Sequence, residues 1–205
     1  MPPGWADGAP AGGASGRLDR LLRSLDPIEE ASDPGEDGSL RSAAVLALID
    51  PDRADLPLLL LRRSWTLRTH PGQVGLPGGT PAAEDAGLWQ TALREAEEEL
   101  AVPTDAVELQ GRASVVPTWN SGYAITPFVA FLRRQFVPQP AGAEVDSYFW
   151  FPLQPAGGRP ERVSRAVTVA QGTLEMPGYL HGEHFVWGAT GAIVDDLLAR
   201  MGGPG

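Results

Sequence analysis

The sequence contains no cysteine and no lysine. Without cysteine, disulfide bonds, thiolate metal sites and a thiol nucleophile are excluded. Without lysine, a phosphate-binding loop ending in Gly-Lys-Ser/Thr is excluded too, and every basic side chain apart from three histidines is arginine. No Gly-x-Ser-x-Gly motif is present, which argues against a Ser-His-Asp hydrolase.

Long hydrophobic runs are also absent. The most apolar run, residues 58–61, is far shorter than the roughly 18 residues that a membrane-spanning helix needs. The first five residues, Met-Pro-Pro-Gly-Trp, lack the basic and then apolar regions of a secretion signal. We therefore expect a cytoplasmic protein without a membrane partner.

Positive charge is scarce: the chain has 16 arginines and 26 acidic residues, and its net charge is −10. An acidic chain repels nucleic acid and anionic membranes at long range, so we expect no nucleic-acid partner. The segment 56–83 is the exception, because it holds no acid and carries Arg62, Arg63, Arg68 and His70. This local basic segment is what an anionic substrate would require.

The length of 205 residues suits one domain with short tails. We expect residues 1–40 to form an N-terminal tail, residues 41–201 the domain, and residues 202–205 a C-terminal tail. Residues 1–16 are rich in glycine, alanine and proline, a composition typical of disorder. In residues 17–25, four leucines at helical spacing predict a short amphipathic helix.

Hydrophobic periodicity predicts a domain of strands with two main helices. The first helix covers about residues 87–101, with Trp89, Leu93, Ala96 and Leu100 as its apolar side, and follows a loop over residues 64–79. The last helix covers residues 190–201. The predicted strands are residues 43–49, 58–62, 107–116, 123–132, 146–151, 166–174 and 183–187. This mixture predicts an α/β fold, a layered α/β/α domain with a mixed sheet.

Three glutamates of the first helix, Glu95, Glu98 and Glu99, are spaced to share one face. Each like-charged pair of neighbours costs about 0.2–0.5 kcal/mol, and a bound divalent cation removes that cost. Carboxylates are hard ligands that suit Mg²⁺ or Mn²⁺. A solvated acidic surface is the alternative interpretation, but the preceding glycine pair Gly78-Gly79 and the basic segment favour a metal site.

The acidic segment resembles the Nudix box, in which a glycine and an acid precede Arg-Glu-apolar-x-Glu-Glu-x-Gly-apolar. Here Gly79 and Asp85 precede residues 94–102, Arg-Glu-Ala-Glu-Glu-Glu-Leu-Ala-Val. The spacing from Asp85 to Arg94 is one residue longer than the commonest form. Ala101 replaces the glycine, and a left-handed backbone at this alanine would cost on the order of 1 kcal/mol. Neither departure removes a carboxylate.

The upstream segment, residues 60–79, resembles the coenzyme A diphosphatase branch of the same family. That branch carries an Arg-Ser pair, then Leu-Arg-x-His-x-Gly-Gln, then Phe-Pro-Gly-Gly. All are present here, with Leu76 in the place of the phenylalanine. Residues 91–95, Thr-Ala-Leu-Arg-Glu, and the downstream segments 123–127 and 185–190 are similar to that branch as well.

The resemblance implies a Nudix-type α/β/α sandwich and a metal-dependent diphosphatase. It implies that Arg94 orients a catalytic glutamate, for which Glu98 is the first candidate and Glu144 the second. Either Arg62 or Arg63 is expected on the solvent side of its strand, because adjacent strand residues face opposite ways. The implied ligands of Mg²⁺ or Mn²⁺ are Glu95, Glu98, Glu99 and the carbonyl of Gly78, and the candidate substrate-binding residues are Arg62, Arg63, Arg68, His70 and Gln73.

The expected reaction splits coenzyme A or acyl-CoA into 3′,5′-ADP and (acyl-)4′-phosphopantetheine. The alternatives are Nudix hydrolysis of ADP-ribose, a nucleotide sugar or a nucleoside triphosphate, and a module that senses a nucleotide without cutting it. The expected partner is a nucleotide-containing small molecule, and a homodimer is left open. We expect His181 and His184 at the surface, Asp195-Asp196 in solvent, and residues 119–123 as a packed loop.

Overall fold

The computed structural model describes residues 12–28, 40–118, 121–156, 158–169 and 172–202. Helix α1 (Gly12–Ser24) confirms the predicted amphipathic helix, and Leu21 is fully buried. It begins before Arg17, so residues 12–16, expected to be disordered, are helical. Residues 1–11 and the loop residues Trp119 and Asn120 lie outside the described part of the chain.

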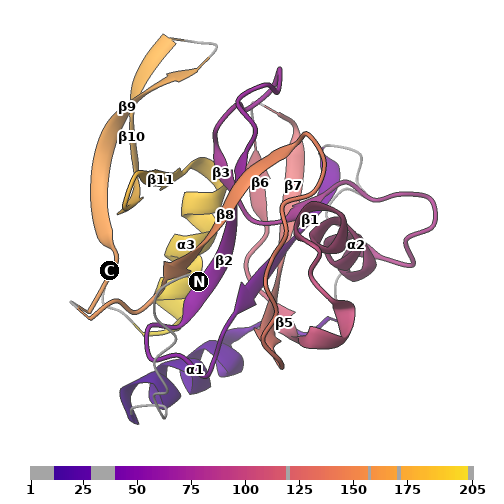
Figure 1. Cartoon of the computed structure of the whole chain (residues 1–205). Coiled ribbons are helices and arrows are strands. Elements are labelled where there is room, and N and C mark those ends of the chain that lie inside the picture. The colour runs from indigo at the N-terminus through magenta and orange to yellow at the C-terminus, as the bar shows by residue number, and fades with distance from the viewer. Residues whose placement is uncertain (1–11, 29–39, 119–120, 157, 170–171, 203–205) are drawn as a thin grey trace.

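The core of the fold is a mixed sheet in the order β3-β2-β1-β7-β5 (Figure 1). Its centre is the parallel pair β1 (Arg41–Ile49) and β7 (Tyr123–Leu132), and the other pairs are antiparallel. The remaining strands are β2 (Pro57–Arg63), β3 (Val74–Gly75), β4 (Gly78–Gly79), β5 (Val107–Arg112), β6 (Val116–Thr118) and β8 (Val145–Pro152). The predicted strand 107–116 is thus two strands, and the predicted loop 64–79 contains two short ones.

Helices cover both faces of this sheet, as the predicted α/β/α sandwich requires. Along β2 the side chains alternate: Leu58 and Leu60 pack in the cluster that includes α3 (Gly188–Arg200), and Leu59 and Leu61 in the one that includes α2 (Leu88–Leu100). All four are almost completely buried. A continuous apolar run is what a strand covered on both faces requires.

Helix α2 lies close to the sheet because its contact face is made of small residues. Thr91, Ala92 and Ala96 are fully buried, whereas Trp89 and Leu93, predicted for the apolar side, are only half-buried. Its C-cap residue, Ala101, has φ 52° and ψ 38°. The Nudix-box position occupied by alanine therefore does adopt the left-handed backbone that favours glycine.

A second, three-stranded sheet consists of β9 (Glu161–Val169), β10 (Gly172–His181) and β11 (His184–Trp187). The β9–β10 hairpin projects from the body of the protein (Figure 1). The predicted single strand 166–174 is wrong, because it spans the end of β9 and the start of β10. β-branched residues stand on both sides of the break, at residues 167–169 and at Thr173, so the local composition conceals it.

Among the described residues, no helix is long and apolar enough to cross a membrane.

Candidate active site

The glycine pair of β4 lets the first glutamate of α2 lie against the backbone of the sheet. Gly78 and Gly79 pair with Val45 and Ala44 of β1. A Cβ atom on Gly78 would come within 2.3 Å of the Ala44 carbonyl oxygen, and one on Gly79 within 2.4 Å of Glu95 Oε1. Any larger residue would displace either β1 or the carboxylate.

The three glutamates share one flank of α2; Glu95 and Glu98 bind the same arginine, and Glu99 binds the backbone of β4. Glu99 Oε2 accepts a hydrogen bond of 3.0 Å from the Gly78 backbone N–H. Glu95 Oε1 and Glu98 Oε2 accept bonds of 3.0 and 3.2 Å from the Arg94 guanidinium. The Glu98 side chain is the most accessible of those paired with Arg94, at 59% exposed.

The environment of Glu99 disfavours the negative charge of its carboxylate. Burial raises the pKa of its carboxyl to about 7, and the negative charges of Glu95 and Glu144 add to the increase. The Gly78 N–H and the Arg63 guanidinium act in the opposite direction but do not cancel it. Burial of the carboxyl is therefore the main reason why its charged form is disfavoured.

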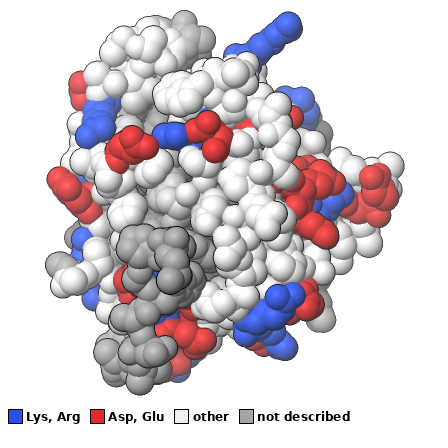
Figure 2. All heavy atoms as spheres, viewed as in Figure 1, with Lys and Arg blue, Asp and Glu red and all other residues white. Residues whose placement is uncertain are grey.

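Arg94 connects the acidic flank to the loop before α2. Its guanidinium donates to Asp85 at 3.1 and 3.2 Å and to the Thr80 carbonyl oxygen at 3.1 Å, in addition to Glu95 and Glu98. Figure 2 shows the acidic side chains gathered around a basic one over α2. These carboxylates keep the Arg94 pKa above its ordinary value, so the group is always charged.

Asp85 is the functional candidate missing from the predicted site residues, although it was recognised as part of the motif. Its side chain is only 4% exposed and also accepts hydrogen bonds from the Thr91 hydroxyl and the Ala82 N–H, at 2.8 and 2.9 Å. Hydrogen bonds from Arg94 and then Ala82 lower its pKa to about 2. The motif acid thus positions Arg94, nine residues later in the chain.

Arg62 and Arg63 are adjacent at the end of β2, but their side chains bind different partners. Arg63 Nη2 lies 3.7 Å from Glu144 Oε2, and its buried Nε has no hydrogen-bond partner in the described structure. Arg62 instead forms ion pairs with Asp146 and Glu183, at 2.5 and 3.1 Å. A register shift between β2 and β8 falls between the two arginines. Of the pair, only Arg63 joins the acidic flank.

Glu144 reaches the site through the backbone of the same two strands. Its carbonyl oxygen accepts a 2.7 Å hydrogen bond from the Ser64 N–H, which holds the start of β8 beside the end of β2. Its carboxylate affects the pKa of Glu99. The structure therefore places the second candidate base, 45 residues beyond Glu99 in the chain, next to the Nudix-box segment.

The remaining predicted substrate residues lie in the loop between β2 and β3. Arg68 and His70 are exposed, and Gln73 is half-buried. The Gln73 carbonyl oxygen accepts a 2.9 Å hydrogen bond from the Arg63 N–H, so the Gln73 backbone holds the loop against β2. His70 has a left-handed backbone, with φ 55°.

The donor set of this site suits a hard divalent cation. Within the described part of the chain, no three Asp, Glu or His side chains converge closely enough to enclose a metal ion as they lie. Glu95 and Glu99 nevertheless repel each other, and Glu99 is buried beside the Gly78 backbone. A cation between these oxygens would offset both the repulsion and the burial.

Comparison with known proteins agrees with the Nudix-box motif. The NUDIX domain family matches residues 39–169. This chain belongs to the Nudix hydrolase family. A Yersinia enterocolitica protein named uncharacterized Nudix hydrolase NudL is 38% identical over 153 residues, which cover 73% of this chain and 76% of that protein. A Citrobacter koseri protein of the same name is 37% identical over 172 residues, covering 82% and 86%.

A solved structure of the Nudix fold, a Caenorhabditis elegans Ap4A hydrolase, is also similar. It is 20% identical, covers 56% of this chain and 82% of its own, and has a TM-score of 0.47. At that level the likeness adds nothing about substrate. The family establishes hydrolysis of a nucleoside diphosphate derivative, and Nudix hydrolases generally use divalent metal ions such as Mg²⁺ or Mn²⁺.

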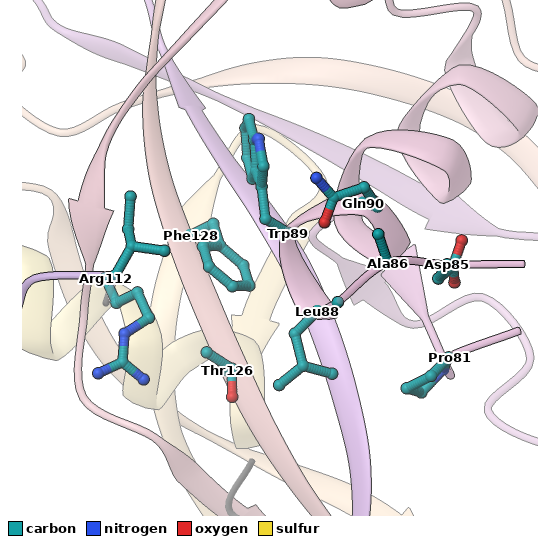
Figure 3. Close-up of a pocket in the computed structure, with 11 residues that line it drawn as sticks. Pro81, Asp85, Ala86, Leu88, Trp89, Gln90, Arg112, Thr126 and Phe128 are labelled. Atoms are coloured by element: carbon teal, nitrogen blue, oxygen red, sulfur yellow. The ribbon is translucent and has the colours of Figure 1, made fainter. Parts of the chain in front are cut away.

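A pocket of about 520 Å³ opens at the N-terminal end of the Nudix helix α2. Figure 3 shows Trp89, Phe128 and Leu88 around it, with Arg112 on the side away from Asp85. The Thr126 hydroxyl beneath it is buried without a hydrogen-bond partner in the described structure. None of the three glutamates is among the residues that line it, so this pocket is not the space over the acidic site.

Two expectations about side chains outside the Nudix box hold only in part. His181 and His184 are half-buried rather than at the surface, and the His184 ring stacks on Phe149 with centroids 3.9 Å apart. Asp195 is not simply solvated, because it accepts hydrogen bonds from the Tyr179 hydroxyl and from Arg162 at 3.0 Å. Its neighbour Asp196 binds Ser114 and Arg200. These contacts attach the second sheet and α3 to the body of the fold.

Proposed function

We propose that this Nudix hydrolase splits coenzyme A or acyl-CoA into 3′,5′-ADP and 4′-phosphopantetheine or its acyl form. The reaction class follows from the family. The substrate rests on the resemblance of residues 60–79 to the coenzyme A diphosphatase branch. The cytoplasmic location expected from the sequence stays a prediction.

The observation that carries the chemistry is the arrangement around Gly78-Gly79, where one flank of α2 brings Glu95, Glu98 and Glu99 against β4. We assign the binding of Mg²⁺ or Mn²⁺ to these three carboxylates and the Gly78 carbonyl. When bound, the ion supplies positive charge for the diphosphate and makes water more acidic.

Glu98 is the proposed proton acceptor for the attacking water. It is exposed enough to meet solvent, and Arg94, itself held by Asp85, restrains its carboxylate from one side. Glu144 is the second candidate, at 66% exposed and beside Arg63. A general base contributes about 10²–10⁴-fold to a rate. Replacing each of these two glutamates by glutamine therefore shows which one is the base.

Arg63 is the first choice for binding the substrate's phosphates, because its Nε is unpartnered and its position adjoins Glu99. Arg68 and His70 are exposed and available in the neighbouring loop, and Gln73 holds that loop through its backbone. Arg62 is a weaker candidate, since two carboxylates already neutralise it. Guanidinium groups match phosphate oxygens through paired hydrogen bonds.

The test is turnover of a substrate panel with Mg²⁺ or Mn²⁺, and with a chelator as control. The panel holds coenzyme A, an acyl-CoA, ADP-ribose, nucleotide sugars and nucleoside triphosphates, with products identified by mass. We expect coenzyme A or acyl-CoA to have the highest kcat/KM. A higher value for another compound would reject the substrate and keep the reaction class. No turnover of any would favour a nucleotide sensor.

Glu98→Gln tests the base. We expect it to lower kcat about 100-fold or more with an unchanged circular dichroism spectrum. The matched control is Glu97→Gln, the neighbouring exposed glutamate, which should keep full activity. If Glu98→Gln is fully active and Glu144→Gln is not, the role passes to Glu144.

A further inference from the structure

Trp65 is an aromatic side chain that the fold leaves open to solvent. Its exposed fraction is 67%, and among the large hydrophobic side chains exposed in the described part of the chain it is the only aromatic one. Trp89, Trp150 and Trp187 are half-buried. The Trp65 indole therefore contributes little to the packing of the core.

A glycine of the same loop fixes the position of the ring. A Cβ atom on Gly72 would come within 2.6 Å of three atoms on the outer rim of the Trp65 ring, Cη2, Cζ3 and Cζ2. Gly72 also has a left-handed backbone, with φ 67°, which favours glycine. The ring thus rests directly on the loop backbone, while most of its surface stays free.

The chain places Trp65 beside the acidic site. It follows Arg63 by two residues, so their Cα atoms lie within about 7 Å of each other. Arg63 Nη2 lies 3.7 Å from Glu144 Oε2, and the Arg63 charge lowers the pKa of Glu99. The indole therefore stands next to the arginine to which we assign the phosphates of the substrate.

The alternation of side chains puts Trp65 on the side of the sheet that carries α2. Leu59 and Leu61 pack in the cluster that includes α2, and Arg63 is the next member of this series. Ser64 still bonds to the chain just before β8 through its N–H, so the extended backbone reaches Trp65. Because side chains alternate along an extended chain, Trp65 continues the series of Arg63.

The charge of the loop suits the phosphates that accompany a nucleobase. Residues 56–83 hold no acid, and Arg68 and His70 are exposed in the same loop as Trp65. Sites for single nucleotides and strands combine a positively charged surface for the phosphates with an aromatic ring on which the base stacks. This loop presents both.

We propose that Trp65 stacks on the adenine ring of the substrate and so contributes to the recognition of its nucleotide half. In coenzyme A one ribose separates the adenine from the diphosphate, so the base reaches only a short way beyond Arg63. The inference rests on the proposed function, because the adenine belongs to coenzyme A.

A docked protein or a lipid surface fits this ring less well than a nucleobase. The exposed residues that flank it in the loop, Thr66 and residues 68–70, are polar, so Trp65 does not belong to an apolar patch. Protein and membrane contacts use contiguous apolar patches, whereas one aromatic side chain is enough to stack one base.

The test is calorimetric titration of the full chain with adenosine 3′,5′-bisphosphate in the presence of Mg²⁺. Trp65→Ala should weaken binding about 5- to 150-fold, the range for loss of one stacked base. Trp65→Phe keeps a flat ring and should stay within about threefold of the wild type. Thr69→Ala, at an exposed position of the same loop, is the matched control and should bind as the wild type does. Unchanged affinity of Trp65→Ala, or no binding by the wild type, overturns the proposal.

A ligand without a base separates stacking from support of the loop. Inorganic diphosphate has no ring, so wild type and Trp65→Ala should bind it equally well. If Trp65→Ala loses affinity for both ligands to the same extent, the indole only supports the loop and the proposal is overturned.

Turnover distinguishes failure of this inference from failure of the proposed function. Stacking is the same in the bound substrate and in the transition state, so Trp65→Ala should raise KM for coenzyme A about 5- to 150-fold and leave kcat within about twofold. If the wild type does not split coenzyme A but Trp65→Ala still binds the bisphosphate more weakly, the substrate is wrong and the stacking stands. If the wild type splits coenzyme A and Trp65→Ala has the same KM, the substrate stands and the stacking is wrong.

Discussion

Replacing Ala101 by glycine should stabilise the protein without changing its activity. Ala101 ends the helix that carries the three glutamates, with φ 52° and ψ 38°. Its N–H still bonds to the Glu97 carbonyl oxygen at 2.9 Å, and this bond does not need the methyl group. The side chain is exposed, so its removal leaves no cavity.

The magnitude follows from two opposing terms. A left-handed backbone costs an L-residue about 1–2 kcal/mol, which glycine does not incur. Glycine also makes the unfolded chain more flexible, which removes about 0.4–1 kcal/mol of the gain. The net increase in the free energy of unfolding should be about 0.5–1 kcal/mol. For a chain of this size, that raises Tm by about 1–4 °C.

Urea unfolding and calorimetry measure this change, and the urea m-value should stay constant. The matched control is Ala192→Gly, at an exposed position inside α3, where the same substitution should lower stability by about 1 kcal/mol. If both variants lose stability equally, the left-handed cap is not strained and the reasoning is refuted. The kcat of Ala101→Gly should match the wild type, because no carboxylate changes.

Three further variants test other parts of the structure. Arg94→Lys should lower kcat at least about tenfold, since lysine cannot bond to Asp85 and the glutamates together; an unchanged kcat would contradict the positioning role. Thr126→Val should raise the free energy of unfolding in urea by about 1 kcal/mol, because a buried hydroxyl without a partner disappears; a clear loss would mean that the hydroxyl is bonded in solution. Burial, and then the hydrogen bond to Asp195, raises the pKa of Tyr179 to about 12. The unfolded tyrosine ionises near 10, so wild-type stability should fall from about pH 10 to about 12. Tyr179→Phe should lack that part of the decline. Equal urea midpoints for the two proteins at every pH would contradict the raised pKa of Tyr179.

The fold was largely predictable because its central elements have strong local patterns. The apolar runs of β1 and β2 and the helical spacing in α2 match the structure to within about two residues, the usual uncertainty of element ends. The β9–β10 hairpin was not predictable, since only a glycine marks its turn and β-branched residues stand on both sides of it, at residues 167–169 and at Thr173.

The acidic site was predictable in its membership but not in its contacts. Helical spacing places Glu95, Glu98 and Glu99 on one flank, and the spacing of Arg94 to Glu98 predicts their contact, which the structure contains. Nothing local indicates that Asp85 binds Arg94, because the loop between them has no regular period. The motif names Asp85, but only its surroundings show what it does.

By itself, the sequence determined the family, the helix that carries the carboxylates and the glycines beside it, because these depend on neighbours within one or two turns of chain. Only the tertiary structure decided which arginine joins the site. Arg62 pairs with Glu183, 121 residues away, and Arg63 with Glu144. Such pairings depend on the register between β2 and β8, and a register is set by packing of the whole sheet rather than by any local pattern.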